Sequence, residues 1–151
     1  MNARLDPARL RIGLLAGFVG VLVSSLANVA GRRTGLLADA MDLKYMSEWL
    51  VDPVASPRRA FKAGLAIHIV LGTLAGAVYA AVAPRFSARS GMRVMVGNWL
   101  QMMLVLFPLT GRGPFGLRRW WGMPAGTLAL NLLYGAVTGF LAGTIQRRMS
   151  R

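Results

Sequence analysis

The chain of 151 residues contains no cysteine, which excludes disulfide bonds, thiolate metal ligands and cysteine nucleophiles. His68 is its only histidine, so histidines of this chain cannot by themselves build a zinc site or a bis-histidine haem site. There are only five acidic residues, and none lies in a long apolar run. This absence argues against paired catalytic carboxylates and against an ion-coupled transporter working alone.

Other catalytic patterns are also missing. Ser24 and Ser25 have no histidine in the same apolar run to activate them, and we expect their hydroxyls to bond back to helix carbonyls. The glycine-rich stretch 111–116 lacks the Gly-Lys-Ser/Thr ending of a phosphate-binding loop. The sequence therefore predicts a protein that is not an enzyme.

What the chain has in abundance is apolar sequence. Hydrophobic residues make up 55% of it, and the mean hydropathy of +0.49 is too high for an ordinary soluble domain of this length. The 18 lysines and arginines give a net charge of +13, but they stand in short clusters between uncharged runs. That interleaving favours lipid phosphate over nucleic acid as the partner of the basic residues.

Four uncharged or nearly uncharged runs have the length of membrane-spanning helices, about 17 to 25 residues, and the third of them is short. They cover residues 12–30, 63–83, 94–111 and 124–145. A cleaved signal peptide is the alternative for the first run, but the run is long for a signal core and Arg32 and Arg33 follow it at once. The predicted fold is all-α, a single membrane domain over 1–151 with four transmembrane helices in a bundle.

The connection between the first two runs, residues 31–59, is the longest. Thr34 is a candidate N-cap, and Pro53 and Pro57 are candidate terminators, of a helix over about 35–52. Its apolar residues would lie mostly on one face of such a helix, which favours an interfacial helix lying along the membrane. A helical loop folded over the bundle is an equally valid interpretation of this pattern.

A few polar side chains interrupt the apolar runs. His68 lies in the second run, Asn98 and Gln101 share a face of the third, and Asn131 lies in the fourth. Lipid offers no hydrogen-bond partner, so we expect these four residues in the bundle interior, with His68 bonded to one of the three amides. Pro108 should kink or end the third helix.

Glycines recur every four residues in the second and fourth runs and therefore line one face of each helix. Such faces let helix backbones approach closely. We expect them to pack against each other, or each against the first run, which carries Gly13, Gly17 and Gly20. The residues assigned to helix packing are Gly64, Gly72, Gly76, Gly135, Gly139 and Gly143.

Between the third and fourth runs stand two arginines and two tryptophans in succession. Arginine beside paired tryptophan is typical of an anchor at the level of the lipid headgroups. We predict that Arg118, Arg119, Trp120 and Trp121 form such an interface anchor.

Three segments together resemble an uncharacterised family of small four-span bacterial inner-membrane proteins, catalogued as a domain of unknown function. The segments are Ile67–Gly72 with Tyr79 and Ala83–Arg85, Gly97–Trp99 with Phe107–Leu109, and Asn131–Gly135 with Gly139. The resemblance implies a multi-pass protein of the bacterial inner membrane and implies no activity. In that family the last span often carries a histidine where this chain has Asn131, a departure that counts against a two-histidine metal or haem site.

The leading functional hypothesis is a non-catalytic accessory or scaffold subunit of a larger membrane complex, or a self-associating bundle, with the lipid bilayer and other subunits as partners. A channel or small-molecule permease acting as an oligomer is the first alternative, with His68, Asn98, Gln101 and Asn131 lining its path. The second alternative is a tetrapyrrole bound through His68, with small Gly64 one turn earlier giving a flat ring room to approach. No metal or other cofactor is expected. An even number of spans places both termini on one side, and the charge distribution does not decide which side.

Overall fold

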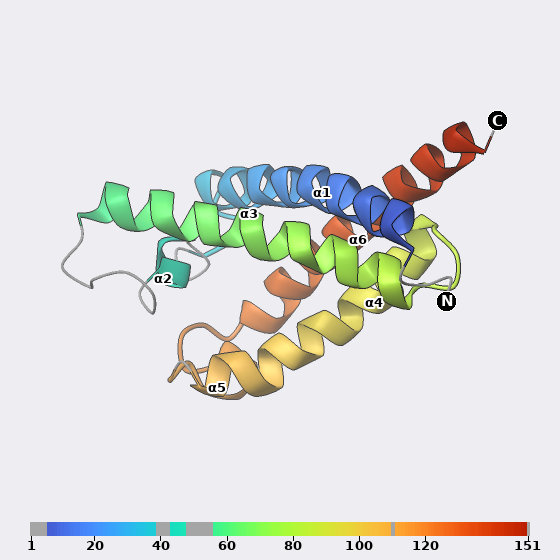
Figure 1. Cartoon of the computed structure of the whole chain (residues 1–151). Coiled ribbons are helices and arrows are strands. Elements are labelled where there is room, and N and C mark those ends of the chain that lie inside the picture. Colours follow the sequence, from blue (N-terminus) through green and yellow to red (C-terminus); the bar gives the residue numbers. More distant parts are fainter. Residues whose placement is uncertain (1–5, 39–42, 48–55, 110, 151) are drawn as a thin grey trace.

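The computed structural model describes residues 6–38, 43–47, 56–109 and 111–150, and the following account is confined to them. They form helices joined by turns, with no strand among them. Figure 1 shows the order of the elements. They are α1 (Pro7–Arg33), α2 (Lys44–Ser47), α3 (Pro57–Val82), α4 (Ala88–Gln101), the π-helical η3 (Met102–Leu106), α5 (Phe107–Leu109), the 3₁₀ turn η4 (Pro114–Gly116) and α6 (Met123–Met149).

Four helical segments have the length and hydropathy of membrane spans. They are Pro7–Arg33, Pro57–Val82, Ala88–Leu109 and Met123–Met149, of 27, 26, 22 and 27 residues. Even the shortest is about 33 Å long at 1.5 Å per residue, which exceeds a bilayer core of about 30 Å. The predicted all-α architecture with four spans is confirmed, and the chain is a multi-pass membrane protein.

The helices extend beyond the uncharged runs because capping residues, not hydropathy, decide where they begin. The Asp6 carboxylate accepts a hydrogen bond from the Ala8 N–H at 3.1 Å and caps α1, with Pro7 in the first helical position. Ser87 and Ser90 form a reciprocal capping box at the start of α4. The extra turns carry arginines, which are Arg9 and Arg11 in α1 and Arg89 and Arg93 in α4.

The connection after α1 differs from the prediction. Thr34 caps the end of α1 instead of the start of another helix, because its hydroxyl donates to the Ala30 and Gly31 carbonyls, both at 3.1 Å. Gly35 then takes φ +75°, which ends the helix, and residues 34–38 form turns and a bend. Pro57 begins α3, whereas Pro53, the other expected terminator, lies outside the described residues. The described part of the expected 35–52 helix is the single turn α2; residues 39–42 and 48–52 lie outside the described residues.

The third span is interrupted before Pro108, as its sequence predicts. The Phe107 N–H bonds to the Met102 carbonyl five residues earlier, which makes the turn η3 wider than an α-helical one. Pro108 has no N–H to continue the α-helical pattern and its ring crowds the preceding turn. The helix ends one residue later, at Leu109.

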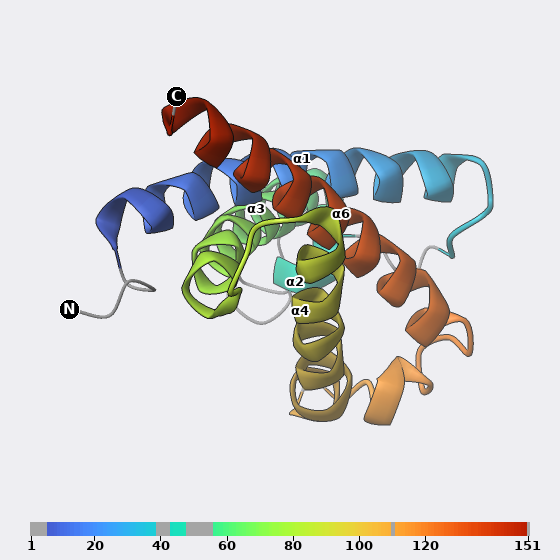
Figure 2. The ribbon, with the colours of Figure 1, turned by 90° about the vertical axis from the view of Figure 1, so that its right-hand side faces the viewer.

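The four spans form a bundle in which each lengthwise boundary between two neighbouring helices is called a seam. Three seams are packed and one is open. α1 packs against both α3 and α6, and α6 packs against α4. α3 and α4 are joined by residues 83–87, diverge from that turn, and scarcely touch elsewhere in the described residues. Figures 1 and 2 show this divergence from two directions.

Glycines close the seam between α1 and α3. A Cβ at Gly17 would stand 2.7 Å from the Gly76 Cα, and one at Gly72 would stand 2.5 Å from the Val21 Cγ2. A Cβ at Gly13 would likewise stand 2.5 Å from the Gly76 carbonyl oxygen. Gly72 and Gly76 thus lie against the first span, which is one of the two arrangements expected for the second run.

The other glycine face packs against a different helix from those expected. Gly135 lies against Gly91 of α4, with the Gly91 oxygen 2.6 Å from a Cβ built at Gly135. Gly139 and Gly143 meet the Ser87 and Phe86 carbonyls just before α4. This face therefore closes the α4–α6 seam and not a seam with α3 or α1.

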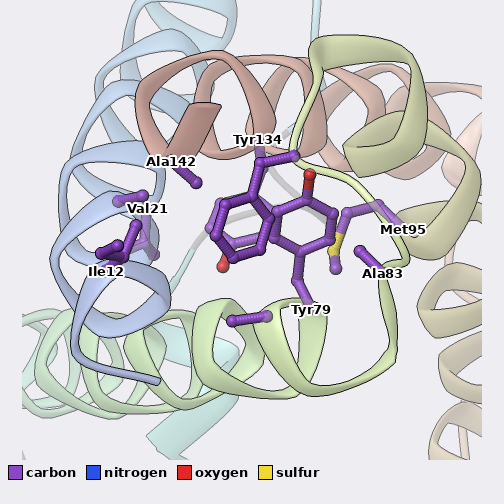
Figure 3. Close-up of a cluster of buried hydrophobic side chains, with 10 residues drawn as sticks. Ile12, Val21, Tyr79, Ala83, Met95, Tyr134 and Ala142 are labelled. Atoms are coloured by element: carbon purple, nitrogen blue, oxygen red, sulfur yellow. The ribbon is translucent and has the colours of Figure 1, made fainter. Parts of the chain in front are cut away.

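Two tyrosines occupy the centre of the bundle. Tyr79 of α3 and Tyr134 of α6 belong to one cluster of buried side chains (Figure 3). The residues that α1 adds to this cluster are Ile12, Ala16 and Val21. The Tyr134 hydroxyl donates to the Gly72 carbonyl at 2.6 Å, and Tyr79 bonds to Ser90 Oγ at 2.8 Å. The first bond joins α6 to α3, and the second joins α3 to the first turn of α4.

Candidate binding groove between α3 and α4

The open seam forms a groove of about 580 Å³ to which all four spans contribute. Its walls are apolar side chains of α3 and of the third span, and its floor is made by α1 and α6. Leu71, Leu74 and Val78 on one wall and Val105 and Leu109 on the other are each more than half exposed. In a membrane protein such exposed apolar walls open the groove sideways to the lipid.

The four polar residues predicted for the bundle interior all line this groove. They are His68, Asn98, Gln101 and Asn131. Two of them are bonded to each other, with the Asn98 amide donating to Asn131 Oδ1 at 3.1 Å. The Asn131 amide in turn donates to the Thr127 carbonyl at 2.9 Å, which fixes its orientation.

His68 and Gln101 are not part of this pair. Neither side chain makes a hydrogen bond with another residue of the described chain; His68 is half-buried, and Gln101 and Asn98 are exposed in the groove. The expected bond from His68 to an amide is therefore not formed in this structure. Its absence leaves an imidazole and a primary amide with donors and acceptors available to an occupant of the groove.

Among the described residues, no charged side chain lines the groove. Within the residues that the structure describes, no three side chains of His, Cys, Asp or Glu come together as metal ligands. The surface beside His68 at Gly64 is covered, because a Cβ there would meet the Leu43 carbonyl and stand 3.3 Å from the Lys44 Cα. The space expected there for a flat ring is filled by the chain itself.

The residues of the predicted interface anchor stand in the turn between α5 and α6. Arg118 and Arg119 are exposed, and Trp121 is 82% exposed. Trp120 is half-buried and packs with Trp99, Met102 and Phe115 against a small core around Met103 and Phe107. Only one of the two tryptophans therefore faces outward.

Three groove residues were not singled out as site residues by the sequence analysis. Ser24 and Asn28 of α1 lie on the groove floor, and Tyr134 borders it from α6. Ser24 and Ser25 bond to the Val21 carbonyl at 3.1 and 2.7 Å, as predicted. Ser24 and Asn28 follow Gly17 by seven and eleven residues, so they lie on the same buried face of α1. This spacing could have identified them as interior residues from the sequence.

The chain is thus a multi-pass α-helical membrane protein whose groove is lined, among the described residues, by apolar and uncharged polar side chains. No family model, curated protein or solved structure matches the chain. The resemblance to a small bacterial inner-membrane family stays a prediction.

Proposed function

We propose that the chain is a non-catalytic subunit of a bacterial inner-membrane complex, and that a transmembrane helix of another subunit fills the α3–α4 groove. The observation that carries this proposal is the single open seam. Three neighbouring pairs of helices are packed, whereas the fourth exposes Asn98 and Gln101. An amide left facing hydrocarbon without a partner is unfavourable by about 2 kcal/mol or more, so the groove favours an occupant.

The spacing of the groove residues favours a helix as that occupant. Val94, Asn98, Gln101 and Val105 are four, three and four residues apart and all line the groove. This alternation is the spacing with which one helix meets another in knobs-into-holes packing. The lining residues run from Val94 to Leu109, about 22 Å along the helix axis, or about four helical turns. A partner helix could contact the groove along all four of these turns.

Co-purification from native membranes in mild detergent tests the proposal. Gln101→Trp should fill the groove and remove the amide, and we expect the recovered partner to fall by about tenfold, the effect of about 1.4 kcal/mol of lost contact. The matched control is Leu26→Trp, which alters an exposed α1 side chain that does not line the groove. Wild-type protein recovered only as a partnerless monomer would contradict the proposal.

A permease is the second candidate, because all four predicted path residues line one groove. We expect proteoliposomes containing the purified protein to release small neutral solutes no faster than protein-free liposomes. The reason is that the groove is a recess between two helices, which we propose is filled by a partner helix and gives no path across the membrane. Flux that disappears when His68, Asn98, Gln101 and Asn131 are all changed to alanine would replace the proposed function with transport.

A further inference from the structure

Seven described arginines gather at one end of the bundle, where α1 begins, α3 turns into α4 and α6 ends (Figure 1). We call this the arginine end, and its members are Arg9, Arg11, Arg85, Arg89, Arg93, Arg147 and Arg148. The two lysines of the chain stand elsewhere, in α2 and in the first turns of α3. The cations at this end are therefore all guanidinium groups, which can bind a phosphate through two N–H groups at once.

No acidic side chain neutralises these arginines within the described residues. Asp6 is the only acid among them, and its carboxylate accepts the Ala8 N–H and forms no ion pair with any of the seven. The other four acids fall between α1 and α3 in the sequence. Like charges gathered without a counter-ion repel one another, so an anion from outside the chain stabilises this end.

Two of the arginines are held in place at Phe86, in the turn between α3 and α4. From α1, the Arg9 guanidinium lies 4.2 Å from the centre of the Phe86 ring and donates to two carbonyls at the end of α3. From α6, Arg147 donates to a hydroxyl three residues earlier. One of its nitrogens lies 3.5 Å from the position of a Cβ at Gly143, and the Phe86 carbonyl oxygen lies 2.9 Å from the same position. Side chains that the protein already holds lose little conformational entropy when they bind an anion.

The depth of these two arginines selects a lipid headgroup as the anion. Arg9 lies three residues before Ile12, where the first uncharged run starts. Arg147 lies two residues after Ile145, where the fourth run ends. At 1.5 Å per residue both lie within about 5 Å of the apolar runs, and the headgroup layer on each side of a bilayer is about 5 to 7 Å thick. Phospholipid phosphates therefore surround this end in the membrane, and a soluble polyanion would have to displace them.

We propose that the arginine end binds anionic phospholipids, with a headgroup phosphate held at Phe86 by Arg9 and Arg147. Arg85 and Arg89, in the same turn and at the start of α4, add to the positive potential there. A zwitterionic headgroup brings its own cation and is the weaker partner of such a surface. Lipid binding at this end does not depend on what fills the α3–α4 groove, so it can fail while the proposed function stands.

Native mass spectrometry of the purified, delipidated protein in a neutral detergent tests the proposal, with phosphatidylglycerol as the probe. The double variant Arg85→Gln, Arg147→Gln should raise the dissociation constant by about 25-fold, because an arginine near the membrane surface contributes about fivefold. The matched control Arg58→Gln, Arg59→Gln removes the same charge from exposed residues at the start of α3 and should leave the constant nearly unchanged. Phosphatidylcholine should bind the wild type more weakly than phosphatidylglycerol does.

Four results would overturn lipid binding at this end. Equal affinity for the two lipids would show that the surface does not select negative charge, and equal weakening by the control pair would trace the binding to net charge alone. Displacement of the lipid by equimolar inorganic phosphate would assign the site to free phosphate. Displacement by an equimolar short DNA oligonucleotide would assign it to nucleic acid.

A second readout needs only the wild-type protein. Phosphatidylglycerol that binds the folded state should raise the midpoint of thermal unfolding, and phosphatidylcholine at the same concentration should raise it less. An unchanged midpoint with phosphatidylglycerol would overturn the inference even if the glutamine variants fail to fold. The variant Arg85→Lys, Arg147→Lys keeps the charge without the two-pronged geometry and should recover part of the affinity that glutamine removes.

Discussion

Gly76→Val is expected to separate α1 from α3 and to lower the free energy of unfolding by about 3 kcal/mol. A Cβ at Gly76 would stand 2.6 Å from the Gly17 Cα and would also meet the Gly13 carbonyl oxygen. All of these are backbone atoms, so no side chain can turn aside to make room. The two helices must move apart along the whole seam, which loses the dispersion contacts that hold helices together in lipid.

Unfolding in mixed micelles, followed by helical circular dichroism, measures this loss. Gly97→Ala is the matched control, because it adds a Cβ to a membrane helix in open space. Its monomer should keep wild-type stability or gain a few tenths of a kcal/mol, roughly the helix preference of alanine over glycine. Equal destabilisation by the two substitutions would show that the α1–α3 seam is not closed by Gly76.

Arg9→Gln is expected to lower the free energy of unfolding by about 2 kcal/mol, after allowance for partial solvent exposure of the guanidinium. Arg9 Nε donates to the Ala80 carbonyl at 2.7 Å, and a second nitrogen donates to the Ala83 carbonyl. The guanidinium also lies 4.2 Å from the centre of the Phe86 ring. One cation thus holds the start of α1, the end of α3 and the turn into α4 together.

Arg11→Gln is the matched control, since Arg11 is exposed on the same helix and makes no hydrogen bond with the described residues. It removes the same charge, so any general effect of charge on the bilayer interaction is shared by both variants. Thermal unfolding of the two variants and the wild type in the same detergent is the measurement. Equal midpoints for all three would contradict the role given to Arg9.

The spans could be predicted because each depends on a property of a single stretch of chain. A run of about 20 uncharged residues is stable as a membrane helix whatever its neighbours are, since all its backbone hydrogen bonds lie within it. Pro108 acted in the same local way, because its missing N–H affects only the adjoining turn. Helix ends were less predictable, and Asp6 and Ser87 extend or begin helices in polar sequence.

The candidate site could be predicted in composition but not in arrangement. His68, Asn98, Gln101 and Asn131 were named from the sequence, and all four line one groove. Which of them would bond to each other depends on the rotation of three separate helices. The structure pairs Asn98 with Asn131 and leaves His68 and Gln101 without a bond to the described chain.

The helical class, the number of spans and the small set of polar groups inside them follow from local hydropathy and local backbone chemistry, and they could therefore be predicted from the amino-acid order. The packing of Gly72 and Gly76 on α1, the packing of Gly135 and Gly139 on α4, and the separation of α3 from α4 depend on how the helices are placed in three dimensions. A glycine face can receive any backbone that reaches it, so its partner is chosen by the lengths of the connections and by the competing packing of all four helices.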